Sequence, residues 1–155
     1  MVIHGQDAGR LQRTQDLMVA EGVDPARVHQ VIGSMEAAET PEKIYTATLE
    51  RFQRIDVLVN NAGAMQKPDT TDEEDPDNLE YLFRANLLSA VKLMQLCVGE
   101  LKKTRGCIVN ISSIGSTRSY PSLTSYGAMK AAMDHFTRNY AAKYGPRGVR
   151  VNSLK

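Results

Sequence analysis

Short apolar runs alternate with longer segments of helical periodicity along most of the chain. The short runs predict β-strands at residues 2–4, 27–33, 55–59, 106–111 and 148–152. Apolar positions at intervals of three and four predict helices over residues 8–21, 40–54, 79–101 and 122–144. Strand and helix alternating throughout predict an α/β fold, in which right-handed crossovers build a parallel sheet.

Local signals sharpen several of these elements. The run at residues 55–59 is almost unbroken in hydrophobicity, which predicts a strand buried on both faces. Asp7 is expected to cap the first helix, and Thr40 to cap the second before Pro41 at its first position. The acidic, Pro-containing residues 66–78 predict an exposed loop, and the small residues at 112–125 predict another.

Length and charge bound the class of protein. A chain of 155 residues favours a single domain spanning residues 1–155. Nineteen Lys and Arg against eighteen Asp and Glu give a net charge of +1, which disfavours a nucleic-acid-binding surface. The longest uncharged apolar runs, such as residues 108–111, are far shorter than the roughly 20 residues of a membrane span, and residues 1–7 do not resemble a signal peptide.

Cysteine and histidine usage excludes two further classes. Cys97 and Cys107 suit neither a disulfide framework nor a zinc site, and are typical of a reducing, cytoplasmic compartment. The three histidines are scattered, and the acidic stretch at residues 71–77 lacks the Gly and Glu of a calcium loop. No metal site is therefore expected.

Candidate chemistry lies on the last predicted helix and the loop before it. Tyr126 and Lys130 are four residues apart and so share a helix face, where the ammonium would lower the phenol pKa toward the range of a general acid–base. Such pairs also occur on ordinary helices. Ser113 follows the carboxyl end of a strand, where ligands of parallel sheets bind, and its hydroxyl could donate to a substrate carbonyl; it could equally be an ordinary loop serine.

These residues belong to a set of motifs that resembles the short-chain dehydrogenase/reductase family. The motifs are Val-Asn-Asn-Ala-Gly at residues 59–63, Ile-Ser-Ser at 111–113, and Tyr-Gly-Ala-Met-Lys at 126–130. Asn86, on the long predicted helix, matches the Asn of the family's catalytic tetrad. The resemblance covers nearly the whole chain, from the family's second strand to its sixth. It implies a Rossmann-type doubly wound parallel sheet that lacks the family's first strand with its glycine-rich turn, and the C-terminal lid and strand.

The resemblance implies an NAD(P)-dependent oxidoreductase that transfers hydride between nicotinamide and a carbonyl or secondary alcohol. Tyr126 would be the general acid–base and Lys130 would lower its pKa. Tyr126 and Lys130 would also bind the nicotinamide ribose of the cofactor, and Ser113 would orient the substrate. Asn86 would hold a water through its backbone and link Lys130 to solvent. A buried Asn satisfied by neighbouring backbone is the plainer interpretation of Asn86.

The resemblance also places the rest of the cofactor. Asn61, Ala62 and Gly63 would line the adenosine, because small residues let backbone approach a ligand closely. Asn60 is expected instead to tie neighbouring strands together.

Two departures from the family affect the dinucleotide. No G-x-x-x-G-x-G occurs before residue 60, so the chain lacks the turn that would hold the pyrophosphate, and strands 2–4 and 55–59 would each face an empty place in the sheet. Gln6 stands where Arg would favour NADP, the Asp that favours NAD is not in its usual place, and Ser34 replaces an acid near the adenine. NAD and NADP both stay open, with a slight preference for NADP.

The long helices predict self-association. By resemblance, segments 78–103 and 122–144 would pair across a two-fold axis, which predicts a homo-oligomer. The alternative to an enzyme is a truncated, non-catalytic product that keeps these dimerisation helices and acts only by association. The coding frame upstream of Met1 and downstream of Lys155 would separate the two.

Overall fold

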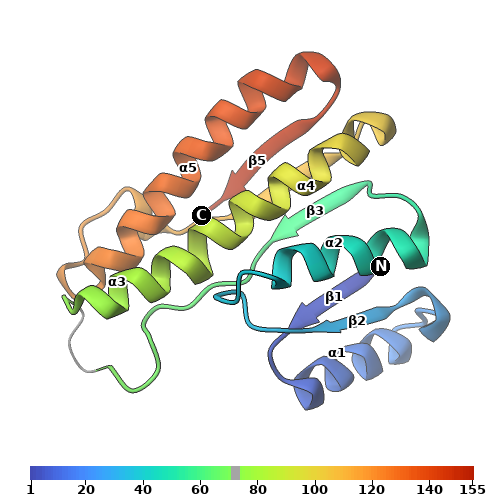
Figure 1. Cartoon of the computed structure of the whole chain (residues 1–155), viewed down its shortest axis with the longest axis horizontal. Coiled ribbons are helices and arrows are strands. Elements are labelled where there is room, and N and C mark those ends of the chain that lie inside the picture. Colours follow the sequence, from blue (N-terminus) through green and yellow to red (C-terminus); the bar gives the residue numbers. More distant parts are fainter. Residues whose placement is uncertain (71–73) are drawn as a thin grey trace.

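A computed structural model describes residues 1–70 and 74–155 as alternating strands and helices (Figure 1). The strands are β1 (Val2–Gly5), β2 (His29–Ile32), β3 (Val57–Asn60), β4 (Cys107–Ile111) and β5 (Arg150–Leu154). The α-helices are α1 (Ala8–Ala20), α2 (Thr40–Phe52), α3 (Pro76–Leu82), α4 (Ser89–Thr104) and α5 (Thr124–Tyr144). A π-helix, η2 (Phe83–Leu88), joins α3 to α4, and short 3-10 turns are η1 (Pro25–Arg27), η3 (Ile114–Ser116), η4 (Pro121–Leu123) and η5 (Gly145–Arg147). The predicted α/β class is confirmed.

The strands form two parallel sheets. β1 pairs with β2, and β3, β4 and β5 form a second sheet in that order. Within the described residues no ladder joins β1 to β3, although both run in the same direction with α2 in front of the space between them (Figure 1). This agrees with the empty place expected between residues 2–4 and 55–59.

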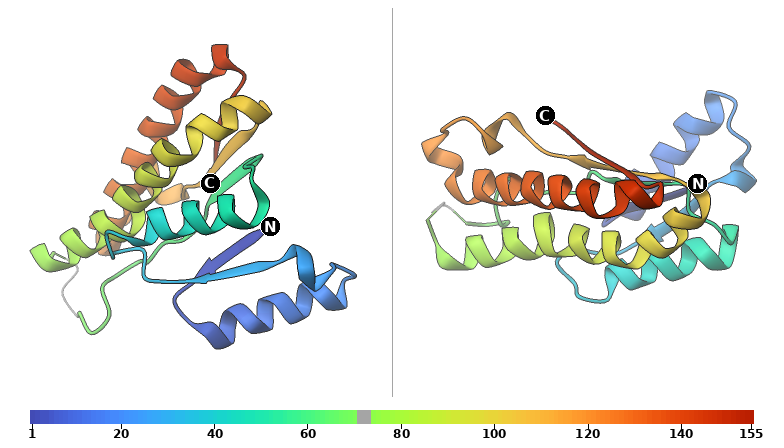
Figure 2. Two further views of the ribbon diagram at one scale, coloured as in Figure 1. Left: turned by 45° about the vertical axis from the view of Figure 1, so that its right-hand side comes forward. Right: turned by 90° about the horizontal axis from the view of Figure 1, so that it is seen from above.

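The helices lie on both sides of the sheets, as in a doubly wound fold. α1 lies on one side, and α2, α4 and α5 lie on the other (Figure 2). Ile108 and Val151 are buried on the side of α4 and α5, whereas Val57 and Val59 are 56% and 54% exposed on the opposite face. The expectation that residues 55–59 are buried on both faces is therefore wrong, because no described helix covers that second face of β3.

The long apolar helix forms the centre of the core. The main cluster of buried residues includes Met94, Leu101, Ile108, Met133 and Val149. By length and composition alone, the segment Pro76–Thr104 could cross a membrane, since an 18-residue window within it has a mean hydropathy of 1.2. However, 56% of that window is buried inside the fold. That burial is what a core helix of a globular fold requires.

Several element boundaries differ from the sequence prediction. The acidic loop ends at Asp75, whose side chain caps α3 by accepting from Asp77 N at 2.9 Å; residues 71–73 of the predicted loop lie outside the described part. Thr40 lies inside α2 and does not cap it; it is buried against Gly33, where an added Cβ would approach its Oγ1 to 2.9 Å. The cap at Asp7 is confirmed, since Oδ1 accepts from Arg10 N at 2.7 Å.

Candidate active site

Tyr126 and Lys130 lie one turn apart near the start of α5, as their spacing predicts. Lys130 is only 5% exposed, and its Nζ lies 5.6 Å from the centroid of the Tyr126 ring. The same ammonium donates to the carbonyl oxygen of Ile111, at the end of β4, at 2.7 Å. Burial lowers the pKa of Lys130, and the negative charge of Asp134 opposes that shift. The two side chains therefore meet at the carboxyl end of the β3–β4–β5 sheet.

Ser113 lies beside Tyr126, and a glycine keeps the space between them open. Ser113 caps η3, where its Oγ accepts from Gly115 N at 3.1 Å. A Cβ on Gly115 would lie 3.4 Å from Ser113 Oγ and 3.9 Å from Tyr126 Cε1, so the two side chains flank Gly115. On α5, a Cβ on Gly127 would come within 2.8 Å of the Gly115 carbonyl oxygen. The absence of a side chain on Gly127 lets the Ser113 segment approach α5 closely.

Asn86 is buried in the π-helix, and its side chain is hydrogen-bonded to the loop that follows β3. It is 2% exposed, its Oδ1 accepts from Ala64 N at 2.7 Å, and its Nδ2 donates to Ala64 O at 2.6 Å. Both polar atoms of the side chain are thus satisfied by backbone, as the plainer interpretation of a buried Asn expects. A π-turn in the middle of a long helix is nonetheless typical of functional sites.

Asn61, Ala62 and Gly63 form an exposed turn at the carboxyl end of β3. Gly63 lies against the site, because a Cβ there would be 3.4 Å from Asn86 Oδ1 and 3.5 Å from Lys130 Nζ. The turn therefore joins the cluster of Asn86, Lys130 and Tyr126 while its backbone stays open to a ligand.

A buried chain of polar side chains fixes the sheet beneath this cluster. Asn60 Nδ2 donates to Asn110 Oδ1 at 2.8 Å, and Asn110 Nδ2 donates to Thr137 Oγ1 at 2.9 Å. Asn60 thus ties neighbouring strands, as expected. Asn110 and Thr137 were not predicted; the signal was an Asn at the same register of two neighbouring strands, since Asn60 pairs with Asn110.

Gln6 and Ser34 also come together, at the carboxyl ends of β1 and β2. Gln6 Nε2 donates to Ser34 Oγ at 3.3 Å. Both are neutral, so this pair brings neither the carboxylate expected for a ribose diol nor a guanidinium for a ribose phosphate. Gln6 and Ser34, which both depart from the family's pattern, therefore also lie side by side in the fold.

The cluster around Tyr126 offers groups that could hold the hydroxyls of a bound ligand. A buried ammonium, a half-buried phenol and the open face of Gly63 lie at one sheet edge. Within the described residues no group of three or more His, Cys, Asp or Glu side chains could hold a metal ion. Cys97 is buried, and burial raises the pKa of its thiol to about 12, so it is not a reactive nucleophile.

The chain is similar in sequence to dehydrogenases and reductases. Residues 2–155 match the family model described as short chain dehydrogenase. An NADPH-dependent aldehyde reductase of Arabidopsis thaliana is 29% identical over 144 residues, which cover 93% of this chain and 49% of that protein. An L-fucose dehydrogenase of Bos taurus is 33% identical over 116 residues, covering 75% of this chain and 43% of that protein. The chain thus spans about half the length of these relatives.

Solved structures match the fold closely. A short-chain dehydrogenase/reductase of Caenorhabditis elegans, solved with cofactor, superposes with a TM-score of 0.92 at 32% identity, over 99% of this chain and 58% of that one. Glucose dehydrogenase of the same organism, in its apo form, gives a TM-score of 0.88 at 34% identity, over 98% of this chain and 60% of that one.

Proposed function

The chain belongs to the short-chain dehydrogenase family, and from that premise we propose that its cluster of Asn86, Ser113, Tyr126 and Lys130 serves NAD(P)-dependent oxidoreduction of a carbonyl or secondary alcohol. The observation that carries the proposal is the meeting of Lys130, Tyr126 and the Ser113 loop at the carboxyl end of one parallel sheet. Ligands of open α/β sheets bind at this edge.

Tyr126 exchanges the proton in this proposal. Its phenol would give a proton to the carbonyl oxygen during reduction and take it back during oxidation. A nicotinamide cofactor held at this site would supply or accept the hydride. The Lys130 ammonium, 5.6 Å from the ring centroid, lies where it would bind the nicotinamide ribose beside the phenol. Ser113 Oγ, on the other side of Gly115, donates a hydrogen bond to the same substrate oxygen.

Asn86 has a positioning role in this proposal. Through its two hydrogen bonds to Ala64 it fixes the turn of residues 61–63, whose open backbone takes the adenosine side of the cofactor. The water relay expected from the resemblance would run from Lys130 through the backbone of the π-helix around Asn86, a region where the helix ladder is already irregular.

We favour NADP slightly over NAD as the cofactor. Gln6 and Ser34 are neutral and offer amide and hydroxyl groups at the carboxyl ends of β1 and β2, and a nearby carboxylate, that of Glu36, accepts from Ser34 Oγ at 3.3 Å. The preference is measured as the ratio of kcat/KM for NADPH to that for NADH, which is expected to exceed one.

The test uses residues 1–155 flanked by the remaining segments of a full-length relative. Hydride transfer is followed by nicotinamide absorbance across a panel of aldehydes, ketones and secondary alcohols. Lys130→Met is expected to lower kcat/KM by about a hundredfold or more. Lys143→Met, which removes an exposed ammonium in the last turn of the same helix, is the control and should leave it unchanged. Equal losses in both variants would contradict the role of Lys130.

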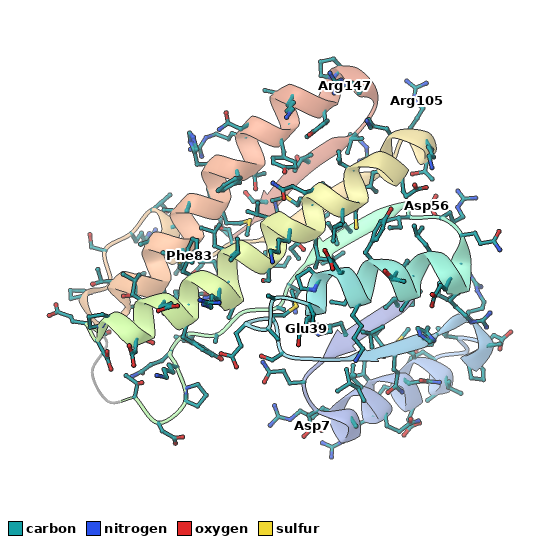
Figure 3. All side chains as sticks on the ribbon, in the orientation of Figure 1. Asp7, Glu39, Asp56, Phe83, Arg105 and Arg147 are labelled. Carbon is teal, nitrogen blue, oxygen red and sulfur yellow. The ribbon has the colours of Figure 1, made fainter. Side chains whose placement is uncertain are left out.

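Association without catalysis is the second candidate, and exposed apolar side chains favour it. Leu79 in α3 is 45% exposed, and Phe83 (Figure 3), one turn later at the start of η2, is 43% exposed. They lie in the segment expected to pair with a second copy. Light scattering should give at least a dimer, and Leu79→Glu with Phe83→Glu should give a monomer that stays folded. A folded monomer before substitution would contradict the association.

A further inference from the structure

A buried carboxylate lies one turn beyond Lys130 on the same face of α5. Asp134 is 6% exposed, and its Oδ2 forms an ion pair with Lys155 Nζ, just past β5, at 3.1 Å. Its Oδ1 is buried, as are the hydroxyls of Ser112 and Ser116, and none of these three atoms has a well-formed hydrogen bond to another described group. Ser112 and Ser116 bracket Ser113 in the chain. A buried charged group is costly unless an ion pair or hydrogen bonds stabilise it.

The surroundings keep this carboxylate charged. Burial raises the pKa of Asp134, but the hydroxyls of Ser116 and Ser112 and the Lys155 ammonium lower it more, so the pKa lies below its ordinary value. Asp134 in turn counteracts the effect of burial on Lys130.

We propose that Asp134 is a positioning residue of the candidate site: it anchors the Ser112–Ser116 segment to α5, and its charge, balanced by Lys155, favours the ammonium form of Lys130. The anchoring follows from the packing of η3 on α5, where Gly127 leaves no room for a side chain, and from the burial of the Ser112 and Ser116 hydroxyls. One carboxylate thus places Ser113 and sets the charge of Lys130 together. The inference rests on the proposed function only in its choice of Ser113 and Lys130 as site residues.

Among the described groups that face Lys130, Asp134 is the one whose charge acts on the ammonium. From α5 these are Tyr126 and Asp134, and from β4 it is the Ile111 carbonyl. From the turn after β3 and from η2 they are Gly63 and Asn86, both uncharged. Across the described part of the chain, the positive charge paired with Asp134 is that of Lys155.

The test measures the pKa of Lys130 in the 155-residue chain without cofactor, by NMR of ¹³Cε-labelled lysine, with the signal assigned through Lys130→Arg. Asp134→Asn removes a nearby negative charge and should lower this pKa by roughly half a unit to one unit. Lys155→Gln removes the balancing positive charge and should raise it by about 0.2 unit. Asp56→Asn, an exposed pair with Arg54 at the amino end of β3, is the control and should not shift it (Figure 3).

Opposite signs distinguish an electrostatic role from simple loosening, which would move both variants in the same direction. Hydrogen exchange of residues 112–118 should also be faster in Asp134→Asn than in Asp56→Asn. Unchanged exchange, no shift of Lys130, or shifts of the same sign would overturn the proposal. If Asp134→Asn does not fold, Lys155→Gln decides: an upward shift supports the proposal, and any other result refutes it. Neither measurement requires activity, so both stand apart from the proposed function.

Discussion

Replacing Gly127 by Ala tests the close approach of the Ser113 segment to α5. In an ordinary helix this change is stabilising by about 1 kcal/mol, because Gly is the weaker helix former. Here the new Cβ would lie 2.8 Å from the backbone carbonyl oxygen of Gly115, a group that cannot move without moving η3. Overpacking of this kind costs about 1–3 kcal/mol. The net change expected is a loss of roughly 0–2 kcal/mol of unfolding free energy.

Gly99 is the matched control, since it also lies inside a long helix, α4. Nothing lies within 4 Å of a Cβ added there, so Gly99→Ala should deliver the whole helix-propensity gain of about 1 kcal/mol. For a chain of this size the gain raises Tm by about 2–4 °C. Urea unfolding followed by circular dichroism measures both variants, and Gly127→Ala should be about 1–3 kcal/mol less stable than Gly99→Ala.

The Gly127→Ala result also tests the candidate active site, because Gly115 lies in η3, the short helix that Ser113 caps. Displacing it moves Ser113 Oγ relative to Tyr126, so an active form of Gly127→Ala should lose kcat beyond what its stability explains. The reasoning is refuted if Gly127→Ala is stabilised as much as Gly99→Ala, since η3 would then not lie against α5 as described.

Three further outcomes are expected. Asn110→Ala removes the central member of the chain from Asn60 to Thr137 and should destabilise by about 2–4 kcal/mol in urea unfolding, against little change for the exposed Asn152→Ala. Burial lowers the pKa of His4 below its ordinary 6.5 and outweighs the opposite effect of its hydrogen bond to the Gly33 carbonyl. The unfolded chain therefore takes up a proton on this histidine before the folded chain does, so the free energy of unfolding falls as the pH drops below about 6.5. The His4→Gln variant should show a smaller fall between about pH 7.5 and 5.5. NADPH should bind the 155-residue chain at least about a hundredfold more weakly than it binds full-length relatives, because two charge-assisted bonds of a glycine turn are missing; a low-micromolar Kd in a fluorescence titration would contradict this.

Much of the fold follows from local patterns. Short apolar runs and apolar intervals of three and four separate strand from helix, and the α/β order they predict is the observed one. The boundaries that fail depend on tertiary contacts: Thr40 is drawn into the core beside Gly33 and so cannot cap α2. The prediction that Val57 and Val59 are buried fails for a different reason. An apolar strand indicates that it can be buried, but which face a helix covers is decided by the connections between strands.

The candidate site was predictable in its residues but not in its supports. Tyr126 and Lys130 follow from helical spacing, and Ser113 follows from its place after a strand. Asn110, Thr137 and Asp134 act through residues distant in the chain: Asn110 meets Asn60 across a ladder, and Asp134 meets Lys155 after another strand. Such partners become visible only when register and packing are known, because a polar residue in an apolar segment does not indicate its partner.

The most direct test of the proposed oxidoreductase site is turnover of Tyr126→Phe in the chain completed with a relative's flanking segments. The variant removes one hydroxyl and keeps the ring that Lys130 faces at 5.6 Å. Loss of a positioned general acid–base lowers kcat by about 10²–10⁴-fold, and that loss is the predicted result. Tyr144→Phe, at the far end of α5, should retain full turnover. Equal turnover of Tyr126→Phe and the parent chain across the carbonyl panel would contradict the assignment.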